Sequence, residues 1–136
     1  MRDAHEALNE NEARMPILRI PADTAASDRY EVDAARLIAG DPRQGVANLY
    51  SDPGRQFHCG IWEAAPATWR VRYSEHEFCH LLEGRILIRD EEGDAMEVRA
   101  GDSFVVPAGF SGTWQVLERA RKLYAIFEPA ASPDGG

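Results

Sequence analysis

The chain of 136 residues has 44% hydrophobic residues, 15 basic and 23 acidic side chains, and a formal net charge of -8. Its length and balance predict one globular domain. The negative charge argues against nucleic acid or an anionic membrane as a partner, because both are bound through clustered cations. No run of 18 apolar residues occurs, so we expect no membrane-spanning helix.

Cysteine usage and the first residues indicate the compartment. The segment Met1–Glu6 lacks the apolar stretch of a signal peptide. Cys59 and Cys79 do not form a CxxC pair, and each lies in a strand-like run. We therefore expect buried free thiols in a cytoplasmic protein.

Residues 1–44 are predicted to form an N-terminal extension that is partly flexible. Within it, Ile17–Pro21 has the pattern of a short edge strand that ends at proline. Asp33 favours the start of a short helix that runs through Ile38 and ends at Gly40.

From residue 45 the pattern becomes that of β-structure, with short apolar or alternating runs separated by turn residues. This pattern is typical of a β-sandwich or barrel, here spanning residues 45–128 and followed by a flexible tail at 129–136. The expected strands are Val46–Ser51, Arg55–Glu63, Trp69–Tyr73, Glu77–Leu82, Arg85–Arg89, Ala95–Val98, Ser103–Val106, Thr113–Leu117 and Lys122–Phe127.

Two motifs have a fixed spacing of glycine, proline and acidic residues. The first is EFCHLLEG, which ends at Gly84, where a tight bend leaves no room for a side chain. The second is GDSFVVPAG, in which Pro107 ends a buried strand and Gly109 permits a positive φ. Together they resemble the two conserved motifs of the cupin superfamily.

The runs Gly60–Glu63, Gly109–Val116 and Arg121–Tyr124 narrow the resemblance to small cupins of the (S)-ureidoglycine aminohydrolase type. The resemblance covers about residues 45–128. It implies an all-β fold, a cupin jelly-roll β-barrel, with the short N-terminal extension outside it. It also implies a homodimer and a site inside the mouth of the barrel.

The motif-one glutamate of cupins faces into the barrel, which places Glu77 inside. Because side chains alternate along a strand, Cys79 and Leu81 then also face in, and Phe78 and His80 face out. The histidine of motif two falls at Gly112 in this sequence. Trp114 and Val116 then share the inward face with it.

Two registers are open for the strand that carries the other two cupin histidines. They fall either at Val71 and Tyr73 or, with an inserted loop residue, at Arg70 and Arg72. We prefer the first, because Trp69 then joins Val71 and Tyr73 on one apolar face and the arginines face out.

The predicted interior is an aromatic pocket with one carboxylate, as in small-molecule sites, although the same residues would also fill a small barrel. A buried Glu77 needs a partner, for which Tyr73, Arg72 and Lys122 are candidates. Without a nearby cation its pKa should rise. We predict Glu77 and Tyr73 as catalytic residues. The predicted substrate-binding residues are Trp62, Val71, Cys79, Phe104 and Trp114.

The leading interpretation is a metal-independent enzyme of the isomerase, lyase or hydrolase type that acts on a small polar metabolite without a cofactor. A non-catalytic ligand-binding protein is the second interpretation. A metal-dependent aminohydrolase or dioxygenase is the third, and the ligand positions oppose it. Val71 and Gly112 have no donor, and a protonated Tyr73 is a poor ligand. Cys79 with His58 is the least unfavourable substitute set, because His80 lies on the wrong face.

Overall fold

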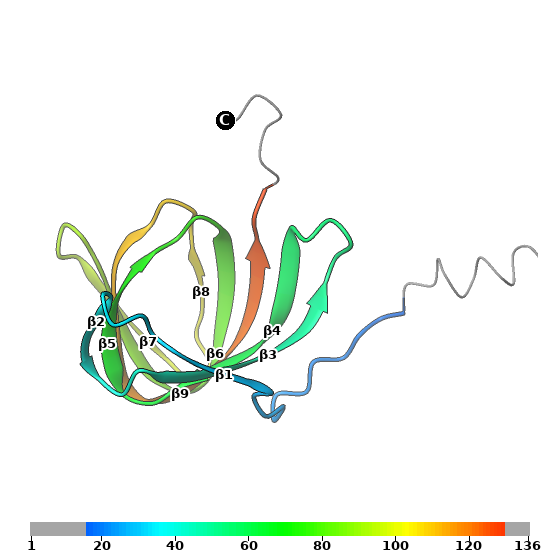
Figure 1. Ribbon diagram of the computed structural model, residues 1–136, viewed down its shortest axis with the longest axis horizontal. Coiled ribbons are helices and arrows are strands. Elements are labelled where there is room, and N and C mark those ends of the chain that lie inside the picture. The colour runs from blue at the N-terminus through cyan, green and yellow to red at the C-terminus, as the bar shows by residue number, and fades with distance from the viewer. Residues whose placement is uncertain (1–15, 130–136) are drawn as a thin grey trace, which may run out of the picture.

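The computed structural model of the chain describes residues 16–129, and its regular structure there is entirely β. The strands form one antiparallel sheet that curls around a central interior (Figure 1). This confirms the predicted all-β barrel. The strands are β1 (Asp28–Glu31), β2 (Leu37–Gly40), β3 (Arg43–Ser51), β4 (Phe57–Ala64), β5 (Ala67–Arg72), β6 (His76–Asp90), β7 (Ala95–Arg99), β8 (Ser103–Val106) and β9 (Ser111–Phe127).

Two long strands, β6 and β9, organise the sheet. Strand β6 pairs with β7, β8 and β9, whereas β9 also pairs with β4 and β5. The sequence predicted each of them as two separate strands, and the structure joins the halves. Register shifts between Leu81 and Ile86 let β6 stay paired with β9. Across these shifts, the inward-facing side chains change from odd-numbered to even-numbered positions. Cys79 and Leu81 are buried before the shifts, and Ile86 and Ile88 after them.

Gly84 occupies the centre of this irregular stretch of β6. Its φ is 92°, a conformation that L-residues rarely adopt. A Cβ atom placed there would lie 2.7 Å from the carbonyl oxygen of Glu118 and even closer to that of Arg119. A glycine is therefore required here both by the backbone conformation and by the close approach of β9.

Gly84→Ala is expected to lower the free energy of unfolding by about 3 kcal/mol, through positive-φ strain and displacement of β9. Urea denaturation followed by tryptophan fluorescence measures this change. Gly93→Ala is the matched control, because Gly93 has a φ of 93° but open space around its Cβ position. The control should cost only about 1 kcal/mol. Equal losses in the two variants would contradict the steric part of the argument.

The helix predicted at Asp33–Ile38 is wrong. Asp33 does start a turn, in which its Oδ1 accepts the N–H of Ala35 at 3.2 Å and its carbonyl accepts the N–H of Leu37 at 3.1 Å. The chain then pairs with β5 as strand β2, with Leu37 opposite Trp69. A single helical turn is marginal on its own, and pairing with β5 satisfies the same backbone groups.

The edge strand predicted at Ile17–Pro21 is also wrong, because these residues have no strand conformation. Instead the segment that follows them is held by β9. The guanidinium of Arg121 donates to the carbonyls of Ala22 at 2.7 Å and Thr24 at 2.5 Å. None of the described elements is a helix that is long and apolar enough to cross a membrane.

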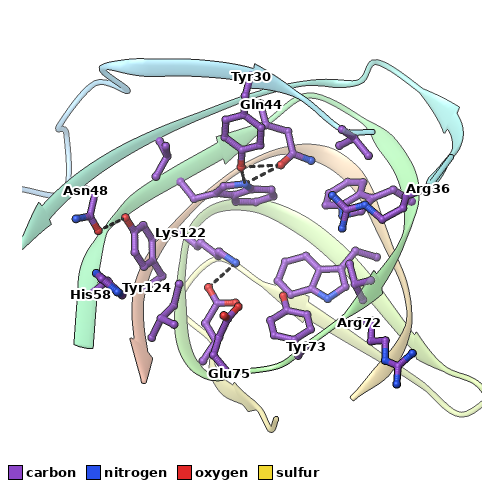
Figure 2. A pocket seen from close by; sticks show the side chains of 18 residues that line it. Tyr30, Arg36, Gln44, Asn48, His58, Arg72, Tyr73, Glu75, Lys122 and Tyr124 are labelled. Atoms are coloured by element: carbon purple, nitrogen blue, oxygen red, sulfur yellow. Dashed lines mark hydrogen bonds and ion pairs between the residues drawn. The ribbon is translucent and has the colours of Figure 1, made fainter. Parts of the chain in front are cut away.

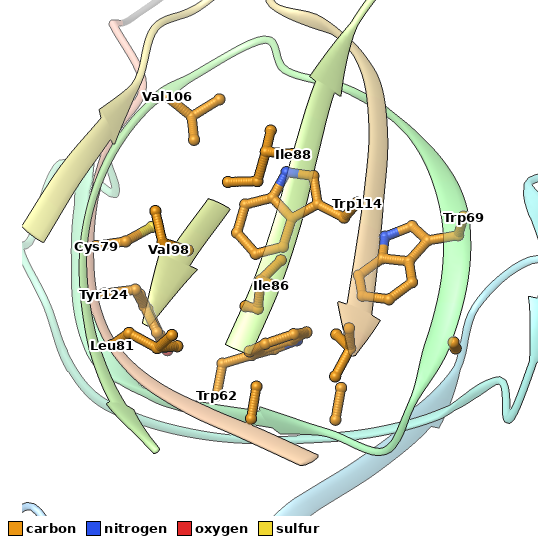
Figure 3. Close-up of a cluster of buried hydrophobic side chains, with 14 of the residues drawn as sticks. Trp62, Trp69, Cys79, Leu81, Ile86, Ile88, Val98, Val106, Trp114 and Tyr124 are labelled. Atoms are coloured by element: carbon orange, nitrogen blue, oxygen red, sulfur yellow. The ribbon is translucent and has the colours of Figure 1, made fainter. Parts of the chain in front are cut away.

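Three tryptophans form the centre of the barrel interior (Figure 3). The ring of Trp114 lies 5.9 Å from that of Trp62 and 6.3 Å from that of Trp69, measured between centroids. They come from β9, β4 and β5, which are neighbours in the sheet. Rigid aromatic packing on three strands fixes the shape of the cavity above it.

Candidate functional site

A cavity of about 420 Å³ opens at the mouth of the barrel (Figure 2). Six of its lining residues are tyrosine or tryptophan, and five charged side chains reach it. The lining residues are Tyr30, Val32, Arg36, Gln44, Val46, Asn48, His58, Trp62, Trp69, Val71, Arg72, Tyr73, Glu75, Glu77, Trp114, Lys122, Tyr124 and Ile126. The cavity therefore has the size of a small-molecule site and a lining that mixes apolar side chains with many polar and charged ones.

Five of the seven predicted site residues line this cavity: Glu77, Tyr73, Trp62, Val71 and Trp114. The other two do not. Cys79 is fully buried in the core, with 0% exposure, and Phe104 packs 6.1 Å from Trp114 on the far side of the pocket lining. The structure thus brings most of the predicted residues together, and their roles stay predictions.

The preferred register of β5 is confirmed. Trp69 is buried, and Val71 and Tyr73 pack against the core. Arg70 and Arg72 are exposed, and Arg72 is also one of the residues that line the cavity.

The predicted facing of β6 is confirmed as well. Glu77, Cys79 and Leu81 are buried, whereas Phe78 is 43% exposed. Alternation therefore placed these side chains correctly on the segment before Gly84.

Glu77 forms an ion pair with Lys122 inside the barrel. The distance from Lys122 Nζ to Glu77 Oε2 is 2.9 Å, and each side chain is 6% exposed. Of the three candidate partners, the structure therefore assigns Lys122. Its Nζ also lies 4.3 Å from the ring centroid of Trp114 and 4.7 Å from that of Trp62. Both aromatic faces stabilise the ammonium group, which helps to offset its loss of hydration.

The surroundings of Lys122 keep it protonated. Burial by itself lowers the pKa of the ammonium group, but Cys79 and the Glu77 carboxylate nearby raise it, and the pKa ends above its ordinary value. Lys122 is therefore an ammonium group at neutral pH. Lys122 is not available as an amine nucleophile, because only the unprotonated form attacks.

Tyr73 stands beside this pair as a neutral hydroxyl. Burial raises its pKa well above the usual value, and the negative charge of Glu77 adds to the effect. Its ring stacks on Trp114 with centroids 6.4 Å apart. Tyr73 can thus donate a hydrogen bond to a ligand at all physiological pH values.

Strands β1 and β3 form a wall of the cavity whose residues were not predicted from the sequence. Trp62 Nε1 donates to Tyr30 Oη and to Gln44 Oε1, both at 3.0 Å, and Tyr30 donates to Gln44 Oε1 at 2.9 Å. Because the indole can only donate, it fixes which amide atom of Gln44 is the oxygen. Gln44 Nε2 has no hydrogen-bond partner among the described residues. No local signal identifies Tyr30 or Gln44, since they reach the site only through strand pairing.

The rim of the cavity has two unlike sides. Arg36 and Arg72 lie on one side, and His58 lies on the other (Figure 2). Ser51 Oγ is 2.6 Å from His58 Nδ1, which fixes the ring of His58 at the mouth. His80, on the outer face, bonds in the same way to Ser103 at 2.8 Å.

Among the described His, Cys, Asp and Glu residues, one group has the ligand atoms of three side chains close enough to share a metal ion. It consists of Asp90, Glu92 and Asp94, whose ligand atoms lie within 4.8 Å of one another on the hairpin between β6 and β7. Glu77 belongs to no such group within residues 16–129, whether with Cys79 or with His58.

Comparison with known proteins agrees with this architecture. The chain is 25% identical to a Pseudomonas syringae protein of unknown function from the DUF861 family, with a TM-score of 0.73. The match covers 79% of this chain and 46% of that protein, so the chain spans about half of its length. A putative ethanolamine utilization protein Q from Salmonella typhimurium is also 25% identical, over 64% of this chain and 71% of that one, with a TM-score of 0.57.

A third solved structure shows the fold alone. It is a predicted oxalate decarboxylase from Thermotoga maritima, 17% identical over 82% of this chain and 100% of that one, with a TM-score of 0.61. No curated protein matches the chain. The family model described as the EutQ-like cupin domain matches residues 51–124. The cupin resemblance of the sequence is therefore confirmed, and the chain belongs to the family of EutQ-like cupin domains.

Proposed function

We propose that the chain is a metal-independent enzyme of the isomerase, lyase or hydrolase type, cytoplasmic, whose small polar substrate binds in the mouth of the barrel. The observation that carries this proposal is the buried pair of Glu77 and Lys122 on the cavity wall. A carboxylate there can accept a proton from a substrate. The Lys122 ammonium and the Tyr73 hydroxyl can stabilise the negative charge that develops, because both are fixed polar groups on the wall of the same cavity.

The test begins with a thermal-shift screen of metabolites, followed by turnover assays on those that bind. Glu77→Gln should reduce turnover by about 100-fold or more, because it removes the proton acceptor. Tyr73→Phe keeps the ring and should leave binding largely intact while turnover falls. Arg70→Gln, on the exposed face of β5, is the control and should behave like the wild type. Full turnover in both site variants would refute the proposal.

A non-catalytic ligand-binding protein is the second candidate. The observation that favours it is the fixed partner of Glu77, since an ammonium at 2.9 Å competes with any substrate proton for the carboxylate. The same screen separates the candidates: a ligand that binds in the mouth of the barrel and is recovered unchanged supports the second one.

A metal-dependent enzyme of the (S)-ureidoglycine aminohydrolase or dioxygenase type is the third candidate. Val71 and Gly112 stand where the fold family has histidines, and Lys122 places a positive charge beside Glu77. A cation that close disfavours a divalent ion. We therefore expect protein purified without a histidine tag to contain no stoichiometric manganese, iron, nickel or zinc. Elemental analysis that finds one ion per chain, lost in Glu77→Ala, would put this candidate first.

We also propose that the protein is a homodimer. Strand β8 pairs only with β6 among the described strands, and Phe78 on β6 faces Val105 on β8. Both side chains are exposed, by 43% and 62%. Sheet edges with apolar neighbours are usually covered. Light scattering at tens of micromolar protein should give twice the chain mass, and Phe78→Glu should lower it. A monomeric wild-type protein would contradict the proposal.

A further inference from the structure

We propose that the ligand of this cavity is a small carboxylate whose anionic group binds to Arg36 and Arg72 at the rim. The inference rests on the proposed function to the extent that it assigns a ligand to the same cavity. It specifies that the small polar ligand is an anion. It also assigns the binding of the anionic group to two residues that play no part in the proposed acid–base chemistry.

The interior of the cavity is already closed to a cationic ligand. Aromatic faces with a carboxylate nearby are the arrangement that binds ammonium groups. In this barrel the chain's own Lys122 fills that position, over Trp62 and Trp114 and against Glu77. A cationic ligand would have to compete with Lys122 and would be repelled by it.

The rim of the cavity, in contrast, favours an anionic ligand, because two arginines lie there. Arg36 precedes β2 and Arg72 ends β5, and these two strands are paired, so both residues reach the same side of the mouth (Figure 2). The N–H of Arg70 donates to the carbonyl of Arg36 at 2.9 Å, which fixes this arrangement.

The two guanidinium groups are free to bind a ligand. Within residues 16–129, neither one forms an ion pair or a side-chain hydrogen bond. Most of the other arginines there do, as Arg29 does with Glu63 at 2.8 Å and Arg43 with Asp41 at 2.7 Å. Two unpaired guanidinium groups at the rim suit a carboxylate ligand, because a guanidinium group can donate two parallel N–H groups to the carboxylate oxygens.

The charges around the cavity fit a monoanion. Three lining side chains are cationic (Arg36, Arg72 and Lys122) and two are acidic (Glu75 and Glu77), in a chain whose net charge is -8. A phosphate dianion would need more compensation, and proteins commonly supply it at the N-terminus of a helix. The described residues contain no helix.

Arg36 also lies outside the part of the chain that the family model matches, residues 51–124. So do Tyr30, Gln44 and Asn48 on the same cavity wall. One of the two proposed carboxylate-binding residues, Arg36, therefore comes from the N-terminal segment, whereas Arg72, Glu77, Lys122 and Tyr73 lie within the matched residues.

Three matched probes of one size test the inference: benzoate, benzamide and benzylamine. All three tryptophans of the chain line the cavity, so a change in their fluorescence reports binding there. Isothermal titration calorimetry supplies the dissociation constants. Benzoate should bind about tenfold more tightly than benzamide, and benzylamine should not bind. Arg36→Gln and Arg72→Gln should each weaken benzoate binding by about tenfold and leave benzamide binding unchanged. Arg70→Gln is the control.

The outcomes separate this inference from the proposed function. Equal binding of benzoate and benzamide, tighter binding of benzylamine, no binding of benzoate, or unchanged binding in both arginine variants would each overturn the carboxylate assignment. If a neutral metabolite from the thermal-shift screen then alters tryptophan fluorescence and is turned over, the proposed function survives. If no probe and no metabolite alters the fluorescence, both fail.

Discussion

Lys122→Met is expected to destabilise the barrel by about 3–5 kcal/mol, because it leaves the Glu77 carboxylate buried without its partner. Methionine keeps most of the length of the lysine side chain, so loss of packing contributes little. Glu77 is 4% exposed, so the variant leaves its carboxylate with little hydration and no cation beside it. The carboxyl group should therefore become protonated in the variant. Urea denaturation at pH 5 and pH 8 measures the effect, and the loss of stability should be larger at pH 8.

The double variant Lys122→Met/Glu77→Leu is the matched control. It removes both charges together, and apolar replacement of a buried ion pair is often neutral or stabilising. We expect it to recover most of the stability that the single variant loses. If Lys122→Met changed stability by less than about 1 kcal/mol, the range of an exposed pair, the pair would not be buried as the structure shows.

Regular strands were predictable because their signals are local. The limits of Ser103–Val106 were predicted as the structure has them, and Ala95–Val98 differs from β7 by one residue. The two long strands were predicted as halves, because Gly84 indicated a tight bend and residues 118–121 were left outside the expected strands. In the structure the register shifts keep the chain paired through these positions, which only the neighbouring strand can reveal.

The N-terminal strands show the opposite case, in which local signals were misleading. Asp33 and Gly40 resemble the two ends of a helix, and Asp33 does form the first turn. The deciding contact is the pairing of Leu37 with Trp69, which are far apart in the sequence. Long-range pairing overrides local propensity, and no pattern within residues 33–40 indicates it.

The candidate site was predictable where a motif gave an anchor. Glu77 came from the motif, and alternation then placed Tyr73, Val71 and Trp114 on the cavity. Lys122 was named as one candidate partner but not included in the site. The sequence contains a usable signal for it, because the only lysine of the chain stands an even number of residues after Trp114.

The wall formed by Tyr30, Arg36 and Gln44 had no such signal. These residues follow no motif, and they reach the cavity because β1 pairs with β3 and β2 with β5. Their side chains decide the polarity of one side of the mouth. The sequence therefore identified site residues within the matched stretch 51–124, and the structure was needed for those that precede it.

Alkaline pH is expected to destabilise the barrel by several kcal/mol between about pH 9 and pH 12. Burial raises the pKa of the Cys79 thiol from 9.0 to about 12. Burial also raises the pKa of Tyr73 and Tyr124. A raised folded-state pKa contributes stability that is complete below the unfolded-state value and is lost as pH rises toward the folded-state value. Cys79 alone should account for about 4 kcal/mol over this window, at about 1.4 kcal/mol per pH unit.

The Cys79 contribution can be isolated with two variants in the presence of a reducing agent. Cys79→Val keeps an apolar side chain in the core and removes the titrating thiol, so its stability should fall less between pH 9 and pH 11 than that of the wild type, by about 2–3 kcal/mol. Cys59→Val is the control, because Cys59 is only half-buried and should leave most of the wild-type slope. Urea denaturation at each pH gives the free energies. A wild-type stability that is flat from pH 8 to pH 11 would mean that the Cys79 thiolate is accommodated inside the barrel, against its complete burial beside Leu81. The nearby Lys122 ammonium is the group that would stabilise such a thiolate, because its positive charge lowers the pKa of the Cys79 thiol.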